Sequence, residues 1–170
     1  MPFGAADVLD VFDRLTAAGV DARLCGGWGV DALIGERTRP HEDLDLWVRI
    51  EHDGALRVTL GAQGFGLLRV DSPWNYVLVD GRGRQVDVHL VHVQVDGTAV
   101  YDVEDDEPYV MPADRFTTGV IAGRVVPCVT AEQQMLDHAG GYEPGETDRA
   151  DMRALKERLG TPLLPPYGQH

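Results

Sequence analysis

Two aspartates in the first third of the chain have a spacing that suits metal-dependent chemistry. Asp43 and Asp45 lie in the segment DLDLWV (43–48), where apolar residues alternate with them. Side chains two residues apart on a β-strand project from the same face, with Cα atoms about 6–7 Å apart. Two unpaired carboxylates are costly to bury in a core, whereas beside a cleft the same pair suits Mg²⁺. The pattern taken alone equally fits a solvent-exposed edge strand.

A third aspartate lies on a later strand-like segment, RQVDVHLV (84–91), where apolar residues alternate with Asp87 and His89. If this strand neighbours the first, three carboxylates meet on one side of the sheet. Such a cluster can hold two metal ions about 3.5–4 Å apart, which activate an attacking hydroxyl group and stabilise leaving pyrophosphate. The alternative is that Asp87 is merely exposed to solvent. A zinc site formed by His89 with His92 is not favoured, because residues three apart on a strand lie on opposite faces.

Residues that suit an anion lie close to the first two aspartates. Gly26 and Gly27 follow a short apolar strand and precede a short helix, so backbone N–H groups can approach a phosphate closely there. Arg39 and His41 come just before Asp43 and are placed to reach phosphate oxygens. A plain strand-to-helix turn and a solvated loop charge are the alternative interpretations.

Taken together, these residues resemble the DNA polymerase beta-like nucleotidyltransferase superfamily. The motif is Gly26-Gly27-Trp28, then Arg39-x-His41-x-Asp43-x-Asp45, then a separate strand aspartate, Asp87. GGWGVDALIGERTRPHEDLDL (26–46) is similar to the matching stretch of lincosamide nucleotidyltransferases and of aminoglycoside 2″-O-nucleotidyltransferases. VDVHLV (86–91), VPCVTAEQQMLDHAGGY (126–142) and ETDRADMRAL (146–155) favour the lincosamide group. The resemblance extends from about residue 8 to residue 158.

The resemblance implies roles for the acidic residues. Asp43 and Asp45 would bind the Mg²⁺ that holds the nucleoside triphosphate. Asp87 would act as a second-metal ligand or as the general base toward the acceptor hydroxyl group, so that these three aspartates form the catalytic and metal-binding set.

The resemblance also implies a nucleotide-binding set and an acceptor pocket. Gly26 and Gly27 would cradle the phosphates, with help from Arg39, while His41 is equally expected to brace the loop. His138 and Tyr142 lie in a segment one residue longer than the family's, and they could contact the acceptor. For Tyr142 the favoured alternative is an aromatic side chain packed at a helix end.

The expected activity is a nucleotidyltransferase of EC 2.7.7 type. It would move a nucleoside monophosphate, AMP from ATP being the expected case, to a hydroxyl group of a small molecule. A lincosamide-like antibiotic is the expected acceptor, with resistance as the outcome. The alternatives are an aminoglycoside or biosynthetic-metabolite nucleotidyltransferase, a metal-dependent phosphohydrolase, and a non-catalytic nucleotide-binding protein of the same fold.

Composition limits the other classes of function. The 28 acidic against 15 basic residues give a formal net charge of −13, which argues against nucleic acid as a partner. The single lysine, Lys156, is too late in the chain to serve a P-loop or a protein kinase. No apolar run approaches the roughly 20 residues that cross a bilayer, and the N-terminus lacks the basic region of a signal peptide. We therefore expect a cytoplasmic protein, monomeric or homodimeric, with Cys25 and Cys128 as reduced core thiols.

Hydrophobic periodicity, glycines and a capping box at Thr130–Gln133 indicate the helices and strands that position these residues. These signals predict helices at 5–18, 28–34, 52–62, 130–139 and 147–159, and strands at 20–25, 43–48, 65–70, 74–80, 84–91, 98–103 and 124–129. The predicted fold class is α+β, a polymerase beta-like mixed sheet with flanking helices and a short helical C-terminal piece. Residues 1–129 would form the nucleotidyltransferase core, and 130–170 a helical extension of the same domain.

Overall fold

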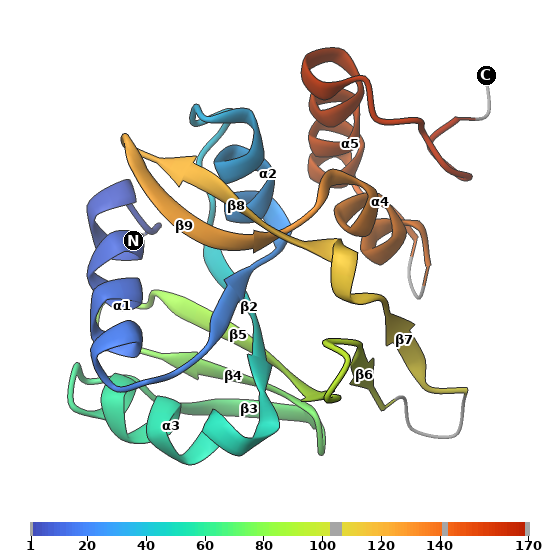
Figure 1. The fold of residues 1–170 in the computed structure, drawn as a ribbon. Helices are drawn as coiled ribbons and strands as arrows, with labels where there is room; N and C mark the ends of the chain where they lie inside the picture. Colours follow the sequence, from blue (N-terminus) through green and yellow to red (C-terminus); the bar gives the residue numbers. More distant parts are fainter. Residues whose placement is uncertain (1, 103–106, 141–142, 169–170) are drawn as a thin grey trace.

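A mixed β-sheet with helices packed on it organises the chain, as the computed structural model in Figure 1 shows. The structure describes residues 2–102, 107–140 and 143–168. The helices are α1 (Ala5–Ala17), α2 (Gly26–Ile34), α3 (Asp53–Gly61), α4 (Ala131–Ala139) and α5 (Glu146–Leu159). The strands are β1 (Ala22–Leu24), β2 (Asp43–Arg49), β3 (Gly66–Ser72), β4 (Asn75–Val79), β5 (Gln85–Val93), β6 (Ala99–Tyr101), β7 (Tyr109–Met111), β8 (Phe116–Ile121) and β9 (Arg124–Val129).

The strand order places the two acidic segments side by side. Hydrogen-bonded neighbours run β3-β4-β5-β2-β1-β9-β8, and β6 joins β5 to β7. The pairs β2/β5 and β1/β9 are parallel, and the other pairs are antiparallel. The predicted hairpin of the second half is confirmed as β4 and β5, which pair from Asn75 opposite His89 to Val79 opposite Gln85.

Alternation along the central strands separates a core face from a polar face. On β2, Leu44, Leu46 and Val48 are fully buried in the largest hydrophobic cluster, together with the alternate valines of β5. Helices α1, α2 and α3 contribute side chains to the same cluster. The intervening positions Asp43 and Asp45 therefore project from the opposite face of the sheet.

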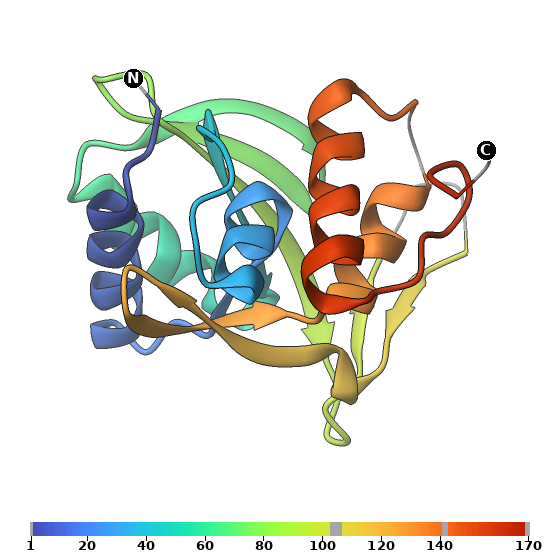
Figure 2. The same ribbon diagram turned by 90° about the horizontal axis from the view of Figure 1, so that it is seen from above.

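The C-terminal helices pack on α2 through a separate apolar cluster. Val30 of α2 meets Met135 of α4 with Met152 and Leu155 of α5, and Tyr167 of the tail covers them. Figure 2 shows α4 and α5 together on one side of the molecule, away from α1. This packing holds the C-terminal piece beside the N-terminal end of α2.

The predicted α+β class is confirmed, with specific differences in the elements. The sequence analysis does not predict strands β7 and β8. The sequence of β8, FTTGVI, has no regular alternation of apolar and polar residues. Gly119 of β8 is required by packing, since a Cβ there would lie 2.4 Å from the carbonyl oxygen of Ala32. Helix α2 begins at Gly26 rather than at Trp28. The division into a core of residues 1–129 and an extension of residues 130–170 stays a prediction.

The capping box at the start of α4 is only half formed. Thr130 Oγ1 accepts a hydrogen bond from the Gln133 backbone N–H, at 3.2 Å. The Gln133 side chain does not return the bond; its Nε2 donates to Tyr109 Oη and to Asp137 Oδ1. A tertiary contact has therefore replaced the local one.

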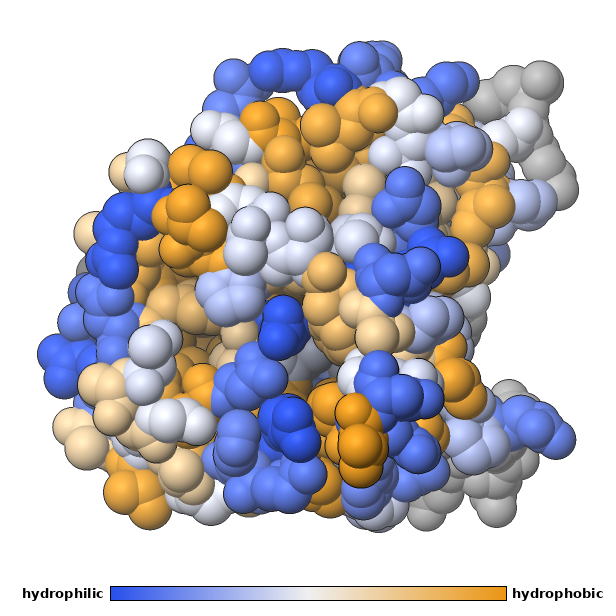
Figure 3. All heavy atoms as spheres, viewed as in Figure 1, coloured by the Kyte–Doolittle hydropathy of each residue, from blue (hydrophilic) through white to orange (hydrophobic). Residues whose placement is uncertain are grey.

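The described part of the chain also shows one face of the molecular surface and both cysteines. On the face shown in Figure 3, hydrophilic and hydrophobic residues are intermixed. Within the described ranges no helix combines the length and apolarity needed to cross a membrane. Cys25 and Cys128 are both buried and unbridged.

Candidate active site

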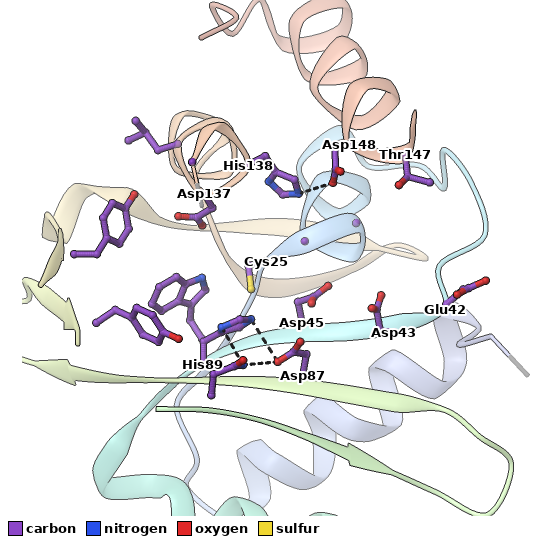
Figure 4. Close-up of a pocket in the computed structure, with 18 of the residues that line it drawn as sticks. Cys25, Glu42, Asp43, Asp45, Asp87, His89, Asp137, His138, Thr147 and Asp148 are labelled. Atoms are coloured by element: carbon purple, nitrogen blue, oxygen red, sulfur yellow. Dashed lines mark hydrogen bonds and ion pairs between the residues drawn. The ribbon is translucent and has the colours of Figure 1, made fainter. Parts of the chain in front are cut away.

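The parallel register of β2 and β5 brings the predicted acidic residues together. Asp45 lies directly opposite Asp87, and Asp43 is two residues before Asp45 on the same face. Figure 4 shows the three carboxylates on one wall of a pocket. The predicted three-carboxylate cluster is thus assembled by strand pairing alone.

His89 extends this acidic wall. Asp45, Asp87 and His89 each offer one ligand atom, and these atoms lie within 4.8 Å of one another. His89 Nε2 is 3.6 Å from Asp87 Oδ1, and Asn75 Nδ2 donates a hydrogen bond of 2.6 Å to the same oxygen. Carboxylate oxygens with an imidazole nitrogen form a donor set that suits a divalent cation. The residues present therefore fit a metal ion.

Electrostatics at this wall support the same interpretation. Burial, followed by the charges of Asp43 and Asp87, raises the pKa of Asp45 well above its usual range. Burial lowers the pKa of His89, against the opposing charge of Asp87, so the imidazole is held in its neutral, ligating form. Like-charge repulsion of this kind is relieved when a cation binds between the carboxylates.

The thiol of Cys25 lies in the same pocket but is unreactive. Burial, followed by the charge of Asp45, raises its pKa well above the usual range. Because the thiolate is the nucleophilic and metal-ligating form, Cys25 stays a protonated, apolar part of the lining.

The two glycines at the start of α2 lie directly against the acidic residues. Gly26 has φ +56°, and a Cβ there would lie 2.0 Å from Asp45 Oδ2. A Cβ on Gly27 would lie 2.3 Å from His41 Nδ1 and 2.8 Å from Arg39 Nη2. Both positions therefore require glycine, because neighbouring side chains pack directly against the N-terminus of α2. Both glycines also line the pocket beside the carboxylates, where a helix N-terminus favours an anion.

The structure places His41 below the pocket rather than on its lining. The ring is 1% exposed, packs at 4.9 Å from the Trp28 ring, and donates from Nε2 to Asp31 Oδ2 at 2.5 Å. Asp31 also accepts from the backbone and hydroxyl group of Thr38. This is the bracing arrangement, so direct contact of His41 with a nucleotide stays a prediction.

Arg39 lines the pocket and is held by the C-terminal helix. Its Nε and Nη2 donate to the two carboxylate oxygens of Asp151, at 2.9 and 2.6 Å. A second pair between the same segments, Arg158 with Glu36, lies in solvent. The predicted phosphate ligand is thus already paired with a carboxylate 112 residues away in the chain.

The pocket itself has a volume of about 1090 Å³, and its far end is aromatic. The Trp47 ring lies 5.6 Å from the His89 ring and 5.2 Å from the Tyr101 ring. Tyr109 and Leu136 add to this wall. The pocket therefore joins a metal and phosphate end to an apolar, aromatic end.

The wall opposite the sheet comes from α4 and α5. Figure 4 shows Asp137, His138 and Asp148 facing the strand carboxylates across the pocket. Burial raises the pKa of Asp137 to about 6, and His138 Nε2 lies 3.9 Å from Asp148 Oδ1. Of the two residues suggested for the acceptor, His138 lines the pocket, and Tyr142 lies outside the described residues.

The pocket is strongly anionic among its described residues. Seven acidic side chains line it. The described lining residues include one arginine, Arg39, and no lysine. The acidic residues are Glu42, Asp43, Asp45, Asp87, Glu107, Asp137 and Asp148. Such a lining suits metal ions and cationic molecules more than a bare anion.

Sequence reasoning missed the far half of the pocket. Trp47 and His89 share the faces of Asp45 and Asp87, as the alternation of each strand indicates, but the sequence analysis assigns neither to the site. Asp137, Asp148 and the Arg39 partner Asp151 carry no local signal, since only tertiary packing brings α4 and α5 to the sheet.

Comparison with known proteins places this site in a family. The model of the aminoglycoside-2″-adenylyltransferase family matches residues 7–155. A lincosamide resistance protein of Staphylococcus haemolyticus is 30% identical over 149 residues, which cover 88% of this chain and 90% of that protein.

Two solved structures share the fold over nearly the whole chain. Lincomycin-bound LnuA, a lincosamide antibiotic adenylyltransferase, has a TM-score of 0.83 and 28% identity, covering 92% of this chain and 98% of that one. ANT(2″)-Ia in complex with adenylyl-2″-tobramycin has a TM-score of 0.74 and 20% identity, covering 92% and 89%. The family match, the relative and the shared fold together show that this chain is an enzyme, a nucleotidyltransferase belonging to the aminoglycoside-2″-adenylyltransferase family of antibiotic-modifying proteins.

Proposed function

We propose that this enzyme transfers AMP from ATP to a hydroxyl group of a lincosamide-type antibiotic, in a reaction that requires Mg²⁺. The observation that carries the proposal is the parallel register that sets Asp45 opposite Asp87, with Gly26 packed against Asp45. That arrangement places three carboxylates beside the N-terminus of α2 in one pocket.

The nucleotide end of the pocket is formed by the carboxylates and the glycines. Asp43 and Asp45 would hold the metal ion, with Asp87 and His89 as neighbouring ligands. When bound, Mg²⁺ supplies charge neutralisation for the triphosphate and for the leaving pyrophosphate. Gly26 and Gly27 line the pocket at the N-terminus of α2, where backbone N–H groups and the helix dipole favour phosphate oxygens.

The chemical step is an in-line displacement at the α-phosphorus of ATP. The acceptor oxygen forms a bond to that phosphorus while the bond to the bridging oxygen of pyrophosphate breaks. Asp87 takes the proton of the acceptor hydroxyl group. Asn75, which donates to Asp87 Oδ1 at 2.6 Å, fixes the direction of that carboxylate. Positioning and electrostatic stabilisation provide most of the rate in such transfers.

The acceptor belongs at the aromatic end. Trp47 and Tyr101 offer apolar faces for a ring-containing molecule, and Asp137, on the same side of the pocket, offers a carboxylate to its amino groups. Asp87 lies between this end and the nucleotide end, so a hydroxyl group placed there reaches the base and the α-phosphate together.

Similarity favours a lincosamide over an aminoglycoside as the acceptor. The Staphylococcus haemolyticus relative and LnuA are 30% and 28% identical to this chain, whereas ANT(2″)-Ia is 20% identical and supports the fold alone. Both classes of antibiotic carry the amino groups that an anionic pocket attracts.

Mass spectrometry of the reaction products tests the proposal. The purified protein is incubated with Mg²⁺, each of the four nucleoside triphosphates, and a panel of lincomycin, clindamycin and several aminoglycosides. We expect lincomycin or clindamycin to gain the mass of AMP, with release of pyrophosphate. An adduct on aminoglycosides alone would show that the acceptor is an aminoglycoside and not a lincosamide. Nucleotide hydrolysis without any adduct would show a phosphohydrolase activity in place of transfer.

A further inference from the structure

We propose that Asp151 is a positioning residue for nucleotide binding, which acts by holding Arg39 at the phosphate end of the pocket. The inference rests on the proposed function, because it takes Arg39 as a ligand of the triphosphate. It assigns to α5 an indirect part in nucleotide affinity, which passes through Arg39.

The pairing of Arg39 with Asp151 has the geometry of a strong, directional contact. Two parallel N–H groups of the guanidinium reach the two carboxylate oxygens, at 2.9 and 2.6 Å. Bidentate pairs of this kind fix the plane of the guanidinium as well as its position. The Nη1 of Arg39 also donates to the carbonyl oxygen of Pro40, at 3.1 Å.

Burial makes the pair a fixed part of the fold rather than a surface contact. The side chain of Asp151 is 2% exposed and that of Arg39 is 27% exposed. A buried carboxylate without a partner is strongly unfavourable, so the fold of α5 demands a cation at this point. Arg39 therefore cannot leave the pocket wall at little cost, as an exposed arginine can.

The guanidinium that Asp151 holds is still able to bind an anion. A guanidinium has five N–H groups, and the recorded bonds to Asp151 and Pro40 use three of them. Its Nη2 lies 2.8 Å from the place of a Cβ on Gly27, so the guanidinium packs beside the N-terminus of α2.

The chain offers a matched control for the contact. Arg158 of α5 pairs with Glu36 at 2.5 Å and joins the same helix to the same loop, but both side chains are more than half exposed. Arg158 does not line the pocket. Removal of that pair therefore shows whether a general loss of contact between α5 and the loop is enough to weaken nucleotide binding while the Arg39–Asp151 pair is kept.

The test measures binding of MgATP by calorimetry in the full chain, with the melting temperature of each variant as a check on folding. Asp151→Asn leaves Arg39 free to turn to solvent, and we expect MgATP to bind about tenfold more weakly, the loss typical for a hydrogen bond to a charged group. Steady-state kinetics should show the same rise in KM for ATP, while KM for the acceptor and kcat change less than about twofold. Arg158→Gln should bind MgATP as the wild type does.

A double-mutant cycle separates positioning from mere stabilisation. In an Arg39→Gln background, Asp151→Asn should weaken MgATP binding no further, because its effect passes through Arg39. Wild-type affinity in Asp151→Asn with only a lower melting temperature would overturn the proposal, and so would a loss of affinity that persists in the Arg39→Gln background. Failure of the wild type itself to bind MgATP would instead overturn the proposed function, together with this inference.

Discussion

Asp45 is the most constrained carboxylate of the site, because it lies between two others and against the backbone of Gly26. Burial and the charges of Asp43 and Asp87 disfavour its ionised form in the metal-free protein. Asp45→Asn removes one of these repelling charges, so we expect the free energy of unfolding at pH 7 to stay equal or to rise. Turnover should fall at least about a hundredfold, because the metal ion loses a ligand and the charge that develops in the transition state is then less well stabilised.

Stability by denaturant titration and turnover by pyrophosphate release check this expectation. The control is Asp114→Asn, since that side chain is 85% exposed and lies outside the pocket. Full activity of Asp45→Asn would show that the metal ligands have been assigned wrongly.

Gly26 is needed for two independent reasons, its backbone angle and the space it leaves. At φ +56° a β-carbon is strained, and it would also lie 2.0 Å from Asp45 Oδ2. Gly26→Ala should therefore lower the melting temperature and displace the Asp45 carboxylate, with loss of most activity. The matched change is Gly54→Ala in α3, where nothing lies within 4 Å of the new methyl group. That variant should gain about 0.5–1 kcal/mol, and equal melting temperatures for both variants would refute the argument.

Residue types and spacing were enough to predict the acidic cluster but not its surroundings. Asp43, Asp45 and Asp87 are readable because a strand shows its two faces directly in sequence. Arg39 illustrates the opposite case. Its position before Asp43 suggests a phosphate ligand, yet its partner Asp151 depends on how α5 docks and could not be inferred locally.

At the scale of elements, α4 connects the sheet to the pocket wall, and its N-cap sets where the helix begins. Thr130 Oγ1 accepts from the Gln133 backbone N–H, at 3.2 Å. Thr130→Ala should cost about 1 kcal/mol of stability, and Thr130→Ser should restore most of it. Chemical denaturation of the three proteins measures both effects, and equal stability of the alanine and serine variants would exclude the cap.

Most elements follow from periodicity, and those that do not have physical reasons. Helix α1 and strands β2 and β5 carry clear patterns, because each buries one face more deeply than the other. Strand β4 is instead readable as a continuous apolar run, since its three central residues are all buried. Strand β8 has polar threonines and a glycine at its centre, where Gly119 lets the sheet approach the backbone of α2. The Gln133 side chain is expected to donate to the N-cap backbone in a capping box. It donates instead to Tyr109 Oη, a tertiary partner that local sequence does not reveal.

At the scale of the whole molecule, the excess of acid makes stability depend on pH, and Asp137 contributes an identifiable part. Its pKa is raised to about 6 by burial in the fold, whereas an unfolded aspartate titrates near 3.9. Between these values the folded state binds more protons than the unfolded state, so this contribution to stability falls as pH rises from about 4 to about 6.

Asp137→Asn removes this contribution. The free energy of unfolding of the variant, relative to the metal-free wild type, should therefore increase between pH 5 and pH 7.5. Urea titrations at the two pH values measure the difference, and Asp114→Asn serves as the exposed comparison. A relative stability that does not change with pH would contradict the assignment to Asp137.

In the proposed reaction, one pocket transfers the adenylyl group of ATP, the α-phosphate with its adenosine, to an acceptor hydroxyl group. The most direct measurement uses ATP labelled separately on its α- and its γ-phosphorus, with Mg²⁺ and lincomycin, and follows where each label goes. We expect the α-label to appear on lincomycin and the γ-label to leave as pyrophosphate, with neither event in the absence of lincomycin. Transfer of the γ-label to lincomycin, or release of both labels without any modified lincomycin, would contradict the account.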